Sequence, residues 1–163
     1  MLLLLQHPGE IDIPQFMKTC REANIEKGKR DYPYFSAYDQ LQIVEDHLTE
    51  YLIESMREGT LRCAVWAPEG KYKAVLRLEK YRDGYLIAGL ATAVNERHKG
   101  YASALLHSLL AALPHTVFYS HIEDGNFISV RLHEKCGFVK IRDTAVFIDG
   151  TVSAHAATYC KMT

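Results

Sequence analysis

Residues 85–94 of the chain read YLIAGLATAV, residues 95–113 read NERHKGYASALLHSLLAAL, and residues 116–138 read TVFYSHIEDGNFISVRLHEKCGF. The first segment is an apolar run of strand length. It leads through a polar turn into a helix whose apolar side chains recur three and four residues apart. A second strand and a second helix follow. Because a crossover helix separates the two strands, we expect them to lie parallel in one sheet.

The turn before the first of these helices has the composition of an anion-binding site. It consists of Arg97, His98, Lys99, Gly100, Tyr101 and Ala102. A helix N-terminus presents unpaired N–H groups and the positive end of the helix dipole, and both favour a phosphate. Gly100 allows the backbone to approach a ligand closely, and Ala102 keeps the first helical turn free of bulk. The alternative is a solvated turn whose three basic side chains face water.

Two patterns in this stretch resemble the GNAT superfamily of N-acetyltransferases. The spacing R-x-x-G-x-A at 97–102 is similar to the pyrophosphate loop of that family, Q/R-x-x-G-x-G/A. The block that begins at Asn126, passes through Ser129 and His133 and ends at Phe138 is similar to its signature N-x-x-A/S-x-x-L-Y-E-K-x-G-F. The N-terminal half fits the family only in the order of its elements.

The resemblance implies a mixed α/β fold with helices on both faces of a mostly antiparallel, twisted sheet. The remaining sequence is compatible with one domain covering 1–163. Its periodicity predicts strands at 2–5, 62–66 and 72–78, helices from Asp12 or Pro14 to Ala23 and over 39–56, a loop over 26–35, and a last hairpin of 139–148 and 151–159 around Asp149-Gly150.

Composition narrows the classes of partner. The net charge is −1, so the chain has no global attraction to nucleic acid or to an acidic membrane. No apolar run approaches the roughly 20 residues that span a bilayer. The four cysteines are scattered without a C-x-x-C pair, which is typical of reduced thiols in a cytoplasmic protein. We expect no metal site. The sequence is compatible with either a monomer or a homodimer.

A glycine inside the first strand indicates where a ligand enters the sheet. Gly89 interrupts an otherwise apolar strand, as glycines do at a β-bulge or at the close approach of a ligand. A bulge there would separate this strand from its parallel neighbour and leave main-chain groups of Leu90, Ala91 and Thr92 without strand partners. The family resemblance implies that this splayed parallel pair holds the pantetheine arm of acetyl-CoA, the co-substrate, with Asn126 and Ser129 nearby.

Three residues are candidates for proton transfer. His133 stands where the family usually has a tyrosine that protonates the departing thiolate, so it acts either as this acid or only as a hydrogen-bond partner. His121 occupies the strand position where some relatives carry a glutamate base, and Glu123 points to the same face. We rank His121 above Glu123. The base glutamate that other relatives carry at the start of the middle strand has no counterpart here.

The resemblance therefore predicts an acetyltransferase that moves an acetyl group from acetyl-CoA directly to a primary amine. The acceptor would be a small molecule, an amino-acid-like compound or a peptide amine. The alternative is a non-catalytic acyl-CoA-binding sensor or interaction module on the same fold.

Overall fold

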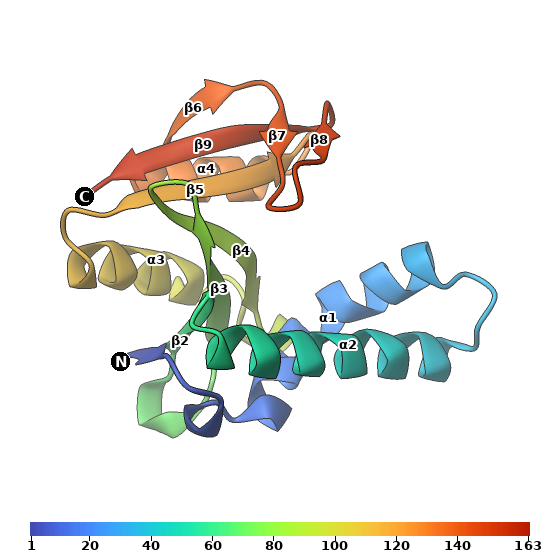
Figure 1. Ribbon diagram of the computed structural model, residues 1–163. Coiled ribbons are helices and arrows are strands. Elements are labelled where there is room, and N and C mark those ends of the chain that lie inside the picture. Colours follow the sequence, from blue (N-terminus) through green and yellow to red (C-terminus); the bar gives the residue numbers. More distant parts are fainter.

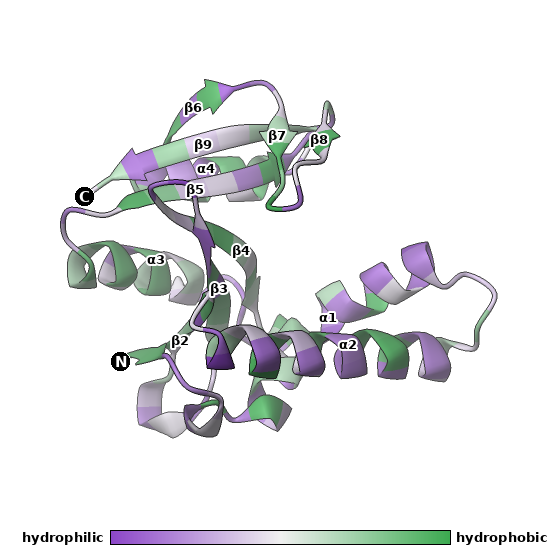
Figure 2. Ribbon diagram, viewed as in Figure 1, coloured by the Kyte–Doolittle hydropathy of each residue, from purple (hydrophilic) through white to green (hydrophobic).

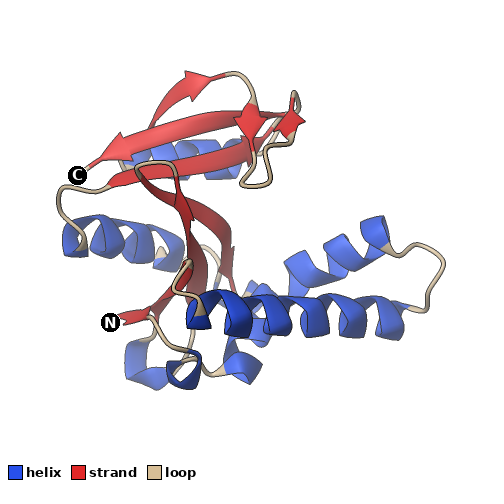
Figure 3. Ribbon diagram, viewed as in Figure 1, coloured by secondary structure: helices blue, strands red, loops and turns tan.

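The computed structural model describes residues 1–163 as a twisted seven-stranded sheet with helices on both faces (Figures 1 and 3). The strand order is β1-β2-β3-β4-β5-β9-β6, and a separate two-stranded sheet joins β7 to β8. Every neighbouring pair is antiparallel except β4 and β5, which are parallel. The strands are β1 (Leu2–Leu5), β2 (Leu61–Trp66), β3 (Ala74–Tyr81), β4 (Gly84–Thr92), β5 (Val117–Glu123), β6 (Val139–Arg142), β7 (Ala145–Val146), β8 (Val152–Ser153) and β9 (Ala156–Met162).

Two hydrophobic cores sit on opposite faces of this sheet. Helices α1 and α2 cover one face, where their side chains pack against Cys63, Val65 and Val75 of the strands. Side chains of α3 cover the other face, where Leu76 and Leu78 point, and Val130 and Leu132 of α4 pack against the same core. The apolar character of α3 and of the strands contrasts with the polar α1–α2 arm in Figure 2. The helices are α1 (Ile13–Asp31), α2 (Ala37–Arg57), α3 (Tyr101–Ala112) and α4 (Phe127–Lys135).

None of these helices combines the length and the apolar character that crossing a bilayer requires. Short 3₁₀ turns at Pro8–Glu10, Pro68–Gly70 and Val94–Glu96 complete the regular structure.

Helix α1 is longer than its sequence suggests. Its N-cap is Asp12, as expected, but the helix continues past Ala23 to Asp31. The loop expected over 26–35 is therefore wrong for 26–31 and confirmed for 32–35. A Cβ at Gly28 would lie 3.0 Å from Cβ of Gln40, and this glycine therefore permits α2 to approach closely rather than ending the helix. Tertiary packing outweighs the helix-breaking tendency of glycine here.

The last hairpin is also more complex than expected. Its central turn at Asp149-Gly150 joins only the short strands β7 and β8. The long strand β9 pairs with β5 on one side and with β6 on the other. All residues of β6 are exposed, whereas those of β9 are buried or partly buried except the last, Met162. Strand β9 therefore occupies the interior of the sheet and β6 its edge.

Candidate active site

The parallel pair opens in the middle of the sheet. Strands β4 and β5 are paired only from Tyr85↔Phe118 to Ile87↔Ser120. Beyond Ile87, β4 keeps β3 as a neighbour as far as Thr92, while β5 keeps only β9. Figure 1 shows the two strands diverging. The expected opening of the sheet, which we call the seam, is confirmed.

A bulge in β4 lies beside the start of the seam. The β3–β4 register shifts between Val75 and Arg77, and Gly89 opposite this shift has φ +61°. Residues with a side chain rarely adopt this backbone conformation, which explains why a glycine stands inside the strand. The expectation of a bulge at Gly89 is confirmed, and Leu90, Ala91 and Thr92 follow it along the edge of the seam.

The turn at 97–102 presents main-chain donors. Gly100 is the N-cap of α3, with φ +78° and no side-chain cap, and His98 also has a positive φ of 61°. The main-chain N–H groups of residues 98–103 take part in no hydrogen bond of the structure. Six consecutive unpaired donors at a helix N-terminus have the chemistry that a diphosphate requires.

The basic side chains of this turn are largely paired already. Arg97 forms an ion pair with Glu22 of α1, and Nζ of Lys99 lies 2.7 Å from Oε2 of Glu96. Lys73 bonds the other oxygen of Glu96. Hydrogen bonds from Lys73 and Lys99 lower the pKa of Glu96 to about 2. The free donors of the turn are therefore mainly those of the backbone.

Helix α4 begins at the open end of β5. Asn126 is its N-cap, and Oδ1 of Asn126 accepts from the N–H of Ser129 at 3.1 Å. Asn126 is exposed and Ser129 is partly buried. One turn further, Nδ1 of His133 lies 2.8 Å from the carbonyl oxygen of Ser129. Because a carbonyl only accepts, Nδ1 carries the proton and Nε2 carries the lone pair.

His133 is almost completely enclosed. It is 1% exposed, its ring meets Phe138 edge to face at 5.0 Å, and its Nε2 has no hydrogen-bond partner. Burial lowers the pKa of His133, and the hydrogen bond that its ring donates to the carbonyl oxygen of Ser129 opposes this only in part. A neutral imidazole with a free lone pair accepts a hydrogen bond and does not donate a proton from Nε2.

His121 lies on the α1–α2 face of β5 and differs from His133 in having both ring nitrogens unpartnered. The rings of Tyr81 and Phe147 stand edge-on to it at 5.6 and 5.4 Å. Burial and, to a lesser degree, Arg82 lower the pKa of His121, while Glu79 opposes the shift. Because buried unpaired ring nitrogens are costly, a water or a ligand is expected to reach them. Glu123 ends the same strand and is exposed.

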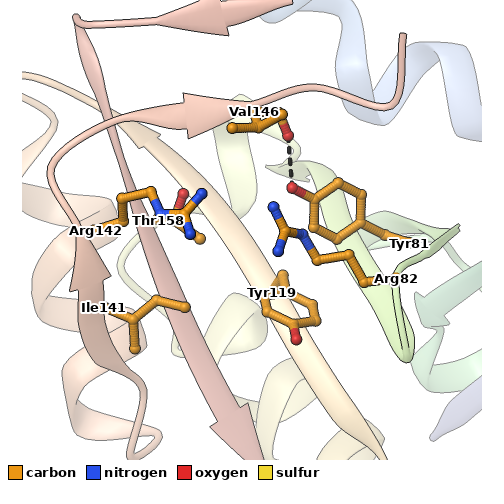
Figure 4. A pocket seen from close by; sticks show the side chains of 7 residues that line it. All are labelled: Tyr81, Arg82, Tyr119, Ile141, Arg142, Val146 and Thr158. Carbon is orange, nitrogen blue, oxygen red and sulfur yellow. Dashed lines mark hydrogen bonds between the residues drawn. The ribbon is translucent and has the colours of Figure 1, made fainter. Parts of the chain in front are cut away.

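A small cavity of about 20 Å³ beside Tyr81 and Tyr119 is not an acceptor site. Figure 4 shows Arg82 between these rings, with the Tyr81 hydroxyl donating to the carbonyl oxygen of Val146 at 2.6 Å. A volume of this size holds about one water molecule. The cluster instead ties the end of β3 to β7.

Sequence reasoning missed two charged residues on the α1–α2 face of the sheet. Arg77 and Glu79 of β3 share this face with Val75, and Nε of Arg77 donates to Oε1 of Glu79 at 3.1 Å. The alternation of charged and apolar residues over 76–79 was the available signal. This alternation predicts that the two side chains share one face of the sheet, but it does not predict a bulge in the neighbouring strand.

The residues around the seam fit acetyl-CoA. The unpaired amides of residues 98–103 suit its diphosphate, and the open edge of β4 suits an amide-bearing chain that pairs like a strand. The orphaned Nε2 of His133 offers one further buried acceptor.

Comparison with protein families identifies the same chemistry. Residues 24–138 match the model of the acetyltransferase (GNAT) family. The comparison with curated proteins gave no match.

Solved structures share the fold at low sequence identity. A spermidine N-acetyltransferase from Vibrio cholerae in complex with CoA and spermine is 18% identical, with a TM-score of 0.61 over 98% of this chain and 94% of that one. The PaiA N-acetyltransferase from Thermoplasma acidophilum in complex with coenzyme A is 11% identical, with a TM-score of 0.64 over 100% and 99%. An N-acetyltransferase from Staphylococcus aureus Mu50 is 15% identical, with a TM-score of 0.64 over 98% and 100%.

Proposed function

The chain belongs to the GNAT family of acetyltransferases, and we propose that it transfers the acetyl group of acetyl-CoA directly to the primary amine of a small-molecule or amino-acid-like acceptor. The observation that carries this proposal is the seam. The opening of β4 from β5 after Ile87 lies at the same end of β4 as six unpaired main-chain N–H groups. One elongated ligand with an anionic end and an amide-bearing arm satisfies both features.

In this proposal the turn at 97–102 binds the diphosphate through its backbone. Gly100 supplies the left-handed conformation that aims the amides outward, and the first turn of α3 adds its dipole. Asn126 and Ser129 border the opposite side of the seam at the start of α4. Main-chain groups of Leu90, Ala91 and Thr92 bind the arm, and an N–H among them stabilises the carbonyl oxygen as negative charge develops on it.

The transfer itself needs a proton acceptor on the α1–α2 face. The acceptor nitrogen forms a bond to the thioester carbon, the carbon–sulfur bond breaks, and the ammonium proton leaves for a base. His121 fits this role because it is held neutral by burial and both of its nitrogens are free. Glu123, exposed at the end of the same strand, is the second candidate.

His133 fits a hydrogen-bond partner better than an acid. Its Nδ1–H is engaged by Ser129, and its buried Nε2 accepts rather than donates. The thiolate then leaves without a proton from this residue, which a thiol of moderate acidity permits.

Free-thiol release from acetyl-CoA in the presence of a panel of amines tests the proposal. Amine-dependent release is expected, together with thermal stabilisation by acetyl-CoA of about 2–3 kcal/mol at 100-fold excess over Kd. Tight binding without release by any amine supports a sensor instead. The absence of any stabilisation by acetyl-CoA contradicts both readings.

A further inference from the structure

The side chain of Arg77 reaches the seam from the neighbouring strand. A Cβ added to Gly89 would lie 2.8 Å from Nη1 of Arg77, so the guanidinium lies directly against the bulge. The bulge begins two residues after the last β4–β5 pair at Ile87. Arg77 therefore projects its charge onto the edge of β4 where that edge becomes free, on the face covered by α1 and α2.

Two contacts hold this guanidinium in one orientation. Its Nε donates to Glu79, which is 8% exposed, and its carbon Cζ lies 5.9 Å from the ring centroid of Tyr51 on α2. The side chain of Arg77 is 21% exposed. A guanidinium stacked on an aromatic ring and tied through Nε has lost most of its rotational freedom before a ligand arrives.

The terminal nitrogens of Arg77 remain free. Nε makes the only hydrogen bond of this side chain, so Nη1 and Nη2 have no acceptor in the chain. Neither atom belongs to the buried polar atoms that lack a partner, so both are reached by solvent. Two parallel N–H groups on Nη1 and Nη2 match the two oxygens of a carboxylate.

The surrounding charges favour an anion over a polycation at this point. Glu79 already neutralises the Nε side of Arg77. Burial lowers the pKa of His121, which also interacts with Glu79, and burial therefore favours the neutral form of this imidazole. Arg82 adds a further positive charge on the same side of His121. An additional ammonium group placed against Nη1 and Nη2 would be repelled, whereas a carboxylate would be attracted.

We infer that Arg77 is a specificity-determining residue that binds a carboxylate of the acceptor, so that the acceptor is an amine with an acid group near its amino group, as in an amino acid. This inference rests on the proposed acetyl transfer at the seam. Gly89 is followed directly by the main-chain groups of Leu90–Thr92. A carboxylate held at Arg77 therefore keeps a neighbouring amine close to the groups that bind the thioester.

Paired acceptors test the inference. Lysine and cadaverine, tyrosine and tyramine, and histidine and histamine differ only by the carboxylate, and spermidine serves as a polycation. With the full-length protein and acetyl-CoA, thiol release should give a kcat/KM for at least one amino acid about 10- to 100-fold above that of its decarboxylated partner, the effect of one charge-assisted bidentate contact. Arg77→Gln should reduce this ratio to near one, mainly through KM of the amino acid.

Arg62→Gln is the matched control. Arg62 is also a sheet arginine stacked on a tyrosine, at 5.6 Å from the ring centroid of Tyr85, but it lies on the opposite face of the sheet. It should leave the ratio unchanged. Arg77→Lys keeps the charge beside Glu79 but loses the two parallel N–H groups of the guanidinium, so it should give an intermediate ratio. Because each ratio is measured on one preparation, partial unfolding of a variant cancels.

The outcomes separate this inference from the function on which it rests. Equal or better turnover of the decarboxylated amines or of spermidine by the unaltered protein overturns the carboxylate site and leaves acetyl transfer intact. An equal loss for both members of a pair in Arg77→Gln also overturns it, since that result places Arg77 in the chemistry of the thioester. Absence of thiol release with every amine overturns the proposed function and the inference together.

Discussion

The two faces of the sheet at the seam are built from different chemical groups. On the side of α3 the available donors are the main-chain N–H groups of residues 98–103. On the side of α1 and α2 the available groups are the side chains of Arg77, Glu79 and His121. A backbone site tolerates changes of side chain, whereas a side-chain site changes with each substitution. The first suits the ligand that a whole family shares, and the second suits one particular acceptor.

The largest expected effect tests the backbone half of this comparison. Gly100→Glu should weaken acetyl-CoA binding by more than about 100-fold, because it removes a left-handed N-cap and places a carboxylate against the diphosphate. No atom lies within 4 Å of a Cβ at this position, so the protein itself does not clash with the new side chain. Isothermal titration with acetyl-CoA measures the change.

Gly150→Glu provides the control for this substitution. Gly150 also has a positive φ, 86°, and open space around its Cβ, but it lies in the turn between β7 and β8. It should lose stability to a similar degree and keep its affinity for acetyl-CoA. Unchanged binding by Gly100→Glu would refute the assignment of the turn.

The next largest effect tests the role of the side chains on the α1–α2 face. His121→Gln should lower kcat by about 100-fold with little change in Kd for acetyl-CoA, as expected on loss of a general base. Because burial lowers the pKa of His121, the neutral base persists below the ordinary value of 6.5, and activity should decline only as the pH falls through that lowered pKa.

The pH profile of kcat therefore distinguishes the two candidate bases. Glu123→Gln, on the same strand and face, should retain the acid limb of the profile, and His121→Gln should lose it. A loss of the limb in Glu123→Gln alone would reverse our ranking of the two residues.

We expect His133 to contribute to stability rather than to proton transfer, with a smaller effect on substitution. Because burial lowers its folded-state pKa, the unfolded chain binds the extra proton first. The contribution is complete above pH 6.5 and is lost as the pH falls through the folded pKa, at no more than about 1.4 kcal/mol per pH unit for one proton. Urea unfolding of His133→Phe between pH 7 and 5 should show a flatter dependence than the unaltered protein. An unchanged slope would mean that His133 does not titrate on unfolding.

The contrast between the faces also explains what the sequence predicted. The turn at 97–102, the N-cap Asn126 and the bulge at Gly89 were predicted because backbone sites depend on glycine, caps and strand–helix order, all of which are local patterns. The identity of the parallel pair followed from the crossover helix. Local rules were wrong at Gly28, where the approach of α2 decides the conformation.

The contacts on the α1–α2 face were not predictable in the same way. Arg77 meets Gly89 only because one residue is inserted in β4, which shifts the register with β3. His121 meets Phe147 of the chain after β7 and Tyr81 of β3, contacts between distant segments. No local spacing encodes such contacts, so the sequence indicated the face of each side chain but not its neighbours.

The smallest expected effect concerns the contribution of the basic side chains of the turn to acetyl-CoA affinity. Lys99 and Lys73 are already bound to Glu96, whose pKa of about 2 keeps it ionised at any working pH. Lys99→Gln should therefore weaken acetyl-CoA binding by less than about threefold, and Glu96→Gln should strengthen it slightly, because exposed ion pairs contribute little. Both changes should vanish near 0.5 M salt, where the screening length is only a few ångströms. Isothermal titrations with acetyl-CoA at low and high salt measure the affinities of the two variants. A loss of 100-fold in Lys99→Gln that persists at high salt would show that side chains, not backbone amides, bind the diphosphate, and the distinction between the two faces would then fail.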